Sequence, residues 1–153
     1  MKYQERKPAV LVLEDGSVYY GKAIGTLGTA TGEICFNTGM TGYQEIFTDP
    51  SYFGQILVST VSHIGNYGIH NDEIESSDLN IAGLVCKKFT DQYYSRSSAS
   101  KSIQEYFEEL GLSGISDVDT RAIVRHIRDS GAMNAIISSE ELDVEILKTK
   151  VKE

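Results

Sequence analysis

The chain is short of cysteine, of positive charge and of long apolar runs. Two of its 153 residues are cysteines, Cys35 and Cys86, and both lie in apolar runs, where a cysteine usually serves as a small buried side chain. A chain of this length buries enough surface to fold without disulfides. We therefore expect both cysteines to be free thiols.

The shortage of basic side chains argues against nucleic acid as a partner. Acidic residues outnumber basic ones by 22 to 14, and the formal net charge is −8, whereas binding to a polyphosphate backbone depends on clustered Lys and Arg. The apolar stretch "AVLVL" near the start is too short for a signal-peptide core. No run approaches the roughly 20 apolar residues of a membrane span. We expect a cytoplasmic protein without a membrane partner.

The first half of the chain reads as a succession of strands. "AVLVLE" and "SVYYGKAIG" flank Asp15-Gly16 and predict a hairpin, with these two residues supplying the positive backbone angles of a tight turn. Further strands are predicted within 32–37, 54–61 and 79–89, where alternation is weak enough to suggest burial on both faces.

The second half has helical periodicity. Three helices are predicted, over 98–111, 118–131 and 138–153, and a strand over 132–138. Ser98 or Ser100 caps the first helix, Asp117 or Asp119 the second, and Gly111 and Gly131 end them. The expected buried stripes are Ile103, Tyr106, Phe107 and Leu110; Ala122, Ile123 and Ile127; and Leu142, Ile146 and Leu147.

Strands early and helices late favour one sheet-rich α/β domain, layered, with the helices covering one face. The last helix is predicted to begin with a capping box formed by Ser138 and Glu141. It has no Gly or Pro terminator and closes in "KTKVKE", which resembles the entrance to a linker. We expect the natural polypeptide to continue beyond Glu153.

The segment "GMTGYQEIFTDPSYFGQ", residues 39–55, is an elaborate connection between two strands. Thr41 and Gln44 have the spacing of a capping box and predict a short helix, which Pro50 prevents from continuing. Two interpretations of the "DPSY" corner stay open at this point. Asp49 and Ser51 either bond only to their own turn, or Ser51 presents its hydroxyl to a ligand.

The residues give little support to a reaction centre. Cys35 or Cys86 could pair on paper with His63, His70 or His126, but neither cysteine lies on the strand-to-helix turn that commonly exposes a nucleophile. Such an independent cysteine hydrolase would need a thiol of depressed pKa. The histidines and cysteines also match no zinc spacing, and we expect no metal site.

Two further motifs have ordinary interpretations. Arg121, Arg125 and Arg128 share a helix face with His126, which predicts a solvated or interface face that could grip a carboxylate or an acidic patch of a partner. "GTLGTATG", residues 25–32, is glycine-rich but lacks the lysine of a phosphate-binding loop. We interpret it as a connection between strands.

The sequence as a whole resembles a known family. "GEICFNTGMTGYQEIFTDPSYFGQILV", "LVLEDGSVYYGKAIG", "HIGNYGIHNDEIESS", "AGLVCKKF" and "ISDVDTRAIVRHIRDSGAMNAII" are similar, in order, to the N-terminal domain of the small, glutamine-hydrolysing subunit of carbamoyl phosphate synthetase. The resemblance covers nearly all of residues 1–153. It implies a β/β/α fold of the swivelling-domain type, in agreement with the order of predicted elements.

The resemblance also implies a division of labour. In this family a Cys nucleophile, a His base and a Glu orienter belong to a following amidotransferase domain, and neither cysteine here matches that nucleophile. Glutamine is hydrolysed there, and the large subunit uses the ammonia with bicarbonate and ATP to make carbamoyl phosphate for arginine and pyrimidine synthesis. The implied partners are glutamine, the large subunit and the chain's own amidotransferase domain; no cofactor is expected in this domain, and the large subunit uses the ATP.

By the same resemblance, Ser51 in "TDPSY" reaches across to help bind the substrate glutamine, while no catalytic residue lies in this chain. The alternative is a stand-alone, non-catalytic module that holds a small polar ligand through residues 39–55.

Overall fold

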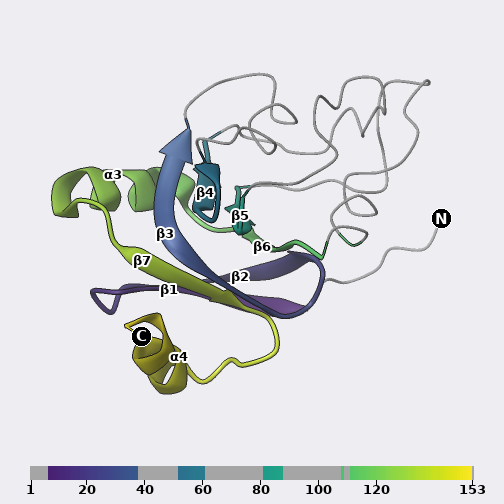
Figure 1. The fold of residues 1–153 in the computed structure, drawn as a ribbon. Coiled ribbons are helices and arrows are strands. Elements are labelled where there is room, and N and C mark those ends of the chain that lie inside the picture. Colours follow the sequence, from purple (N-terminus) through teal and green to yellow (C-terminus); the bar gives the residue numbers. More distant parts are fainter. Residues whose placement is uncertain (1–6, 38–51, 61–80, 88–107, 109–110, 153) are drawn as a thin grey trace, which may run out of the picture.

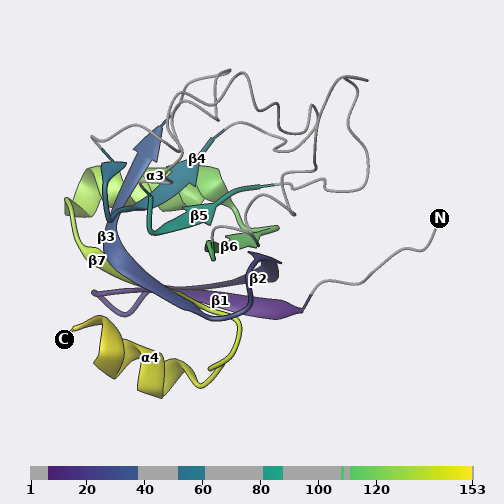
Figure 2. The same ribbon diagram turned by 45° about the vertical axis from the view of Figure 1, so that its right-hand side comes forward.

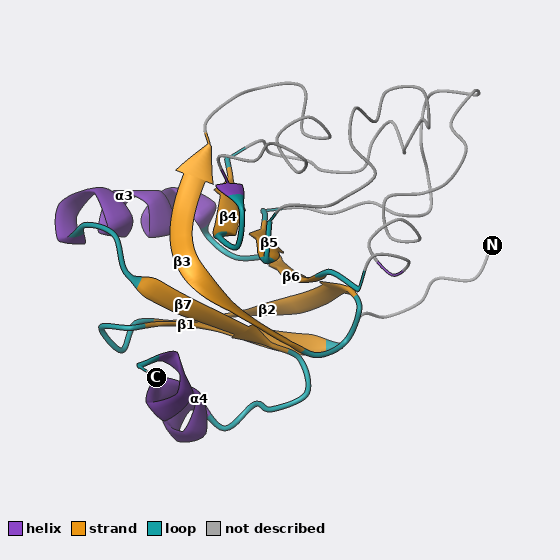
Figure 3. Ribbon diagram, in the orientation of Figure 1, coloured by secondary structure: helices purple, strands orange, loops and turns teal. Residues whose placement is uncertain are grey.

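The computed structural model describes residues 7–37, 52–60, 81–87, 108 and 111–152. Within these ranges the chain forms strands and helices in the order β1 (Pro8–Leu13), β2 (Val18–Gly25), β3 (Thr29–Asn37), β4 (Ile56–Ser59), β5 (Gly83–Val85), β6 (Ser113–Ser116), α3 (Thr120–Ser130), β7 (Asn134–Ser138) and α4 (Val144–Val151). The predicted sheet-rich α/β class is confirmed (Figure 3).

The strands close into a barrel in the order β1-β2-β6-β5-β4-β3-β7 (Figure 1). β3, β4, β5 and β6 run parallel to one another in neighbouring pairs, and the other neighbours are antiparallel. The strands predicted within 54–61 and 79–89 are present but shorter than those ranges. Because parallel neighbours need long connections, segments distant in sequence meet at the barrel ends.

The predicted hairpin forms, and β1 pairs with β2 from Pro8↔Lys22 to Val12↔Val18. The Gly16 N–H donates to the Leu13 carbonyl at 2.9 Å, and Gly16 has φ of 95°. Asp15 does not share this positive angle, so the prediction for it was wrong. The turn needs a left-handed residue at one position, and glycine adopts that conformation without steric cost.

Alternation along β1 divides the core between two helices. Leu11 and Leu13 face the main cluster, to which α3 contributes Ile123 and Ile127. Val10, Val12 and Ile136 face a second cluster closed by Leu147 and Val151 of α4. The two described helices therefore lie on opposite sides of β1 and β7 (Figures 1 and 2). The expectation that the helices cover one face was wrong for these two.

Helix α3 begins and ends as predicted. The carboxylate of Asp119 accepts a hydrogen bond from the Ala122 N–H at 3.1 Å, and Gly131 ends the helix with φ of 88°. The buried stripe differs by one position, because Val124 is buried and Ala122 is exposed.

Helix α4 begins later than predicted. Ser138 is the last residue of β7, and its hydroxyl accepts from the Glu141 N–H at 2.9 Å without starting a helix. Asp143 caps α4 instead, accepting from the Glu145 N–H at 3.0 Å. Of the predicted apolar face only Leu147 is buried, while Leu142 and Ile146 are exposed.

The predicted helix over 98–111 lies outside the described residues except for Glu108 and Gly111, and the short helix after Thr41 lies wholly outside them. No helix in the described part of the chain is long and apolar enough to cross a membrane.

Candidate functional site

The loop that carries the candidate binding residue starts at the end of β3. Ser51 itself lies outside the described residues, and the description resumes at Tyr52. The Asn37 side-chain amide donates to the Tyr52 hydroxyl at 2.8 Å. The Thr60 N–H donates to the Asn37 carbonyl at 3.2 Å, just beyond β4. The first bond therefore ties Tyr52 to the carboxyl end of β3, and the second joins the carboxyl ends of β3 and β4 to each other.

The turn after Ser51 is fixed by its backbone. The Gln55 N–H donates to the Tyr52 carbonyl at 3.0 Å, and Gly54 has φ of 70°. The Gln55 carbonyl accepts from the Ala82 N–H at 2.8 Å, which ties the turn to the segment before β5. A Cβ atom at Gly32 would lie 2.3 Å from the Gly54 carbonyl oxygen. Only glycine allows β3 to approach the turn so closely.

The same turn exposes an aromatic ring that sequence reasoning missed. Phe53 is 76% exposed, although phenylalanine is among the residues most often buried. Its neighbour Tyr52 is half-buried. Tyr52 thus packs on the barrel, whereas Phe53, two residues after Ser51, points outward. The sequence contains no signal that distinguishes these two aromatic residues.

The two thiols are poor nucleophiles. Burial, with a smaller contribution from the Glu33 carboxylate, raises the pKa of Cys35 to about 11. Cys86 is fully buried, and both cysteines are free, as predicted. Only the thiolate attacks carbonyl carbon, so a cysteine hydrolase requires a thiol of depressed pKa. The raised pKa of Cys35 contradicts that hypothesis for this residue.

His126 does not form a catalytic triad with its neighbours. Its Nε2 atom lies 2.5 Å from Asp15 Oδ2 and 3.2 Å from the Ser17 hydroxyl. A triad needs the carboxylate on one ring nitrogen and the nucleophile on the other. Here both partners meet the same nitrogen, so the group joins α3 to the β1–β2 turn. His63 and His70 lie outside the described residues.

Of the glycine-rich segment 25–32, which was predicted to be a strand connection, only residues 26–28 connect β2 to β3, and the others belong to these strands. The amides of this connection point toward the chain itself: the Thr26 N–H donates to the Leu112 carbonyl at 2.8 Å, and the Gly28 N–H donates to the Ser139 hydroxyl at 2.9 Å. A phosphate cradle needs such donors to be available. These two are already used by the fold.

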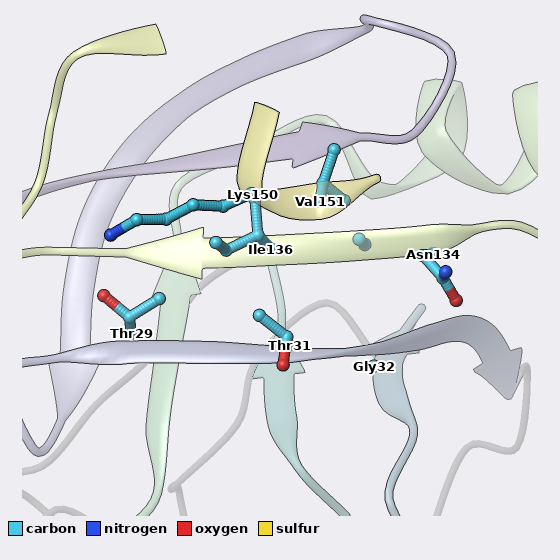
Figure 4. Close-up of a pocket in the computed structure, with 8 residues that line it drawn as sticks. Thr29, Thr31, Gly32, Asn134, Ile136, Lys150 and Val151 are labelled. Carbon is cyan, nitrogen blue, oxygen red and sulfur yellow. The ribbon is translucent and has the colours of Figure 1, made fainter. Parts of the chain in front are cut away.

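A hollow of about 440 Å³ lies between β3, β7 and α4 (Figure 4). The side chains of Lys150 and Thr29 point to the same end of it in this view. The Thr29 hydroxyl donates to the Glu140 carboxylate at 2.8 Å. Within the described ranges, no group of three His, Cys, Asp or Glu side chains could hold a metal ion. Nothing in the hollow supplies a nucleophile with its base.

The described residues define a sheet-rich α/β barrel domain in which Tyr52, next to the candidate Ser51, is tied to the end of β3. The chain matches the family model described as "Carbamoyl-phosphate synthase small chain, CPSase domain" over residues 11–137. Since this match spans most of the sequence, the chain belongs to that family, and the resemblance drawn from its motifs is confirmed.

Relatives agree with this assignment. A carbamoyl phosphate synthase small chain from Aquifex aeolicus (strain VF5) is 48% identical over 148 residues, which are 97% of this chain and 40% of that protein. The small chain from Thermotoga maritima is 46% identical over 147 residues, 96% of this chain and 37% of that protein. The chain thus spans about 40% of the length of such relatives.

Among solved structures, an aminopeptidase from Aneurinibacillus sp. strain AM-1 aligns with 90% of this chain and 31% of its own. The TM-score is 0.48 and the sequence identity is 14%, which is too weak a likeness to carry an argument.

Proposed function

We propose that this chain is the N-terminal domain of a glutamine-hydrolysing small subunit. In this role it scaffolds the glutaminase domain and docks on the large synthetase subunit, so that ammonia from glutamine is used with bicarbonate and ATP to make carbamoyl phosphate. Membership of the small-chain family over residues 11–137 is the observation that carries the proposal.

The chemistry of the thiols supports a division of labour. Glutaminase chemistry needs a thiolate that attacks the side-chain amide carbon, releases ammonia and is freed by water as glutamate forms. Cys35 has a pKa of about 11 and Cys86 is fully buried, so neither suits that step. The nucleophile would come from the polypeptide that makes the relatives more than twice as long as this chain.

In this proposal Ser51 contributes its hydroxyl to the glutamine site. The corner that follows it is held by the Asn37–Tyr52 hydrogen bond and by the close approach of Gly32 to Gly54. A hydroxyl next to a turn that the fold already holds would lose less conformational freedom on binding a polar ligand than one in a free chain.

The test uses the full-length subunit assembled with its large subunit. We expect Ser51→Ala to lower kcat/KM for glutamine by about tenfold, the loss of one substrate hydrogen bond. Synthesis from added ammonia should stay unchanged, because that route bypasses the glutamine site. Unchanged glutamine kinetics would remove Ser51 from the site. Robust ammonia release by this domain alone would overturn the division of labour.

A further inference from the structure

Helix α3 presents three arginines on one face. Arg121, Arg125 and Arg128 are spaced four and three residues apart and therefore lie along one side of the helix. All three are exposed. The side that packs on the barrel carries different residues, namely Thr120, Ile123, Val124 and Ile127. We refer to the three arginines as the arginine face.

Within the described ranges the three arginines form no ion pair, although the exposed Asp129 follows Arg125 by one turn. The ion pairs there are His126–Asp15 and Lys148–Glu145, and none involves the three arginines. Arg121 and Arg125 are one turn apart, a spacing at which like charges weakly destabilise a helix. The face is therefore a local concentration of positive charge in a chain of net charge −8 that gains no described ion pair from it.

One end of the arginine face is held in place. The Arg128 guanidinium lies over the Phe36 ring, 5.1 Å from its centroid, in a cation–π contact. Phe36 is next to the last residue of β3, where the loop that leads to Ser51 begins. A guanidinium positioned by such stacking loses less freedom on binding a carboxylate than a free one.

We propose that the arginine face of α3 docks on an acidic surface of the large synthetase subunit; this inference rests on the proposed function. A guanidinium pairs with carboxylate through two parallel hydrogen bonds, which gives the contact both strength and direction. The rest of the chain carries net negative charge, which disfavours its contact with an acidic partner and helps to steer such a partner to this face.

The placement of the helices favours a separate subunit over the chain's own following domain. α3 and α4 lie on opposite sides of β1 and β7 (Figures 1 and 2). Polypeptide that continues after α4 would thus start on the side away from the arginine face. Nucleic acid is disfavoured by the net charge of −8.

The experiment measures binding of the full-length small subunit to the large subunit. In the test variant, Arg121→Glu and Arg125→Glu are combined. Its matched control combines Lys150→Glu and Lys152→Glu, which changes the net charge equally at two exposed positions of α4 and its C-cap. We expect the Kd of the arginine variant to rise by about tenfold or more, and that of the control to stay within about twofold. Added salt should weaken wild-type binding more than that of the arginine variant.

The outcomes separate the two proposals. Wild-type protein that does not bind the large subunit would refute the proposed function. If the wild type binds and the arginine variant and the lysine control have the same Kd, the docking proposal for the arginine face is overturned, while the proposed function stands. This holds when neither variant weakens binding, and also when both weaken it equally, because net charge would then be the cause. If the glutamate variant unfolds, Arg121→Gln with Arg125→Gln decides, because it removes charge without adding repulsion. If the glutamine variant binds the large subunit with wild-type affinity, the docking proposal is also overturned.

Discussion

His126 Nε2 lies 2.5 Å from Asp15 Oδ2 and joins helix α3 to the turn between β1 and β2. The two side chains are about one-third exposed, 32% and 36% respectively. The Ser17 hydroxyl lies 3.2 Å from the same nitrogen. This contact fixes the rotation of α3 about its axis, while Arg128 is held over Phe36 at the end of β3.

The His126–Asp15 contact predicts that the free energy of unfolding falls in the acidic pH range. Partial burial raises the pKa of Asp15, but hydrogen bonds from the Ser17 backbone, His126 and the Ser17 hydroxyl outweigh it, and the net pKa lies below its ordinary value of 3.8. A depressed pKa in the folded state stabilises the fold above the unfolded-state value, and this stabilisation is lost as pH falls through the folded-state value. We expect Asp15→Asn to lower the free energy of unfolding at pH 7 by about 0.2–1 kcal/mol, the range for an exposed pair.

Denaturant unfolding of the wild type and Asp15→Asn from pH 7 down to pH 2 checks this prediction. The difference between them should shrink as the pH falls below 3.8. Asp129→Asn is the matched control, because Asp129 is an exposed carboxylate on α3 that makes no ion pair among the described residues. A wild type whose advantage over Asp15→Asn is constant with pH would contradict a role for the ionised Asp15.

The thiols give a second prediction. With a pKa of about 11, Cys35 carries roughly one thousandth of its thiol as thiolate at pH 8. We therefore expect iodoacetamide to label Cys35 about a hundredfold more slowly than a thiol of ordinary pKa 9.0. The rate should climb as the pH approaches 11, and Cys86 should stay unlabelled until the protein unfolds.

Peptide mapping by mass spectrometry follows the two cysteines separately. Glu33→Gln provides the internal control: it removes the smaller cause of the raised pKa and leaves the burial, so labelling of Cys35 should speed up modestly. Labelling of Cys35 at pH 8 as fast as that of glutathione would show that its thiol is accessible and ionised.

Local chemistry made some elements predictable from sequence. The β1–β2 hairpin has a turn glycine between apolar strands, and α3 has an aspartate cap, an apolar stripe and a terminal glycine. β6 was missed, because "SGIS" has no strand-like pattern. Its Gly114 is required by packing instead: a Cβ atom there would lie 2.7 Å from the Leu84 carbonyl oxygen. Barrel closure depends on such contacts between distant segments.

The candidate site could be predicted only in part. The corner in residues 39–55 is marked by Pro50 and by its turn residues, and the family resemblance points to Ser51, whose role stays a prediction. The support beneath the corner could not be predicted, because Asn37 and Tyr52 are 15 residues apart and meet only when β3 and β4 lie side by side. Sequence patterns report local preferences and not such pairings.

That support yields the last prediction. Tyr52→Phe removes only the hydroxyl that accepts the Asn37 amide at 2.8 Å and leaves the ring in place. One neutral hydrogen bond contributes about 0.5–1.5 kcal/mol, so we expect kcat/KM for glutamine in the assembled enzyme to fall by about three- to tenfold. Ammonia-dependent synthesis should not change, because Tyr52 acts by positioning the corner. Asn37→Ala removes the same hydrogen bond together with any other contact of Asn37, so the double variant should cost little more than Asn37→Ala alone. Additive losses would mean that the two residues act independently, and equal losses with glutamine and ammonia would indicate a general effect on stability.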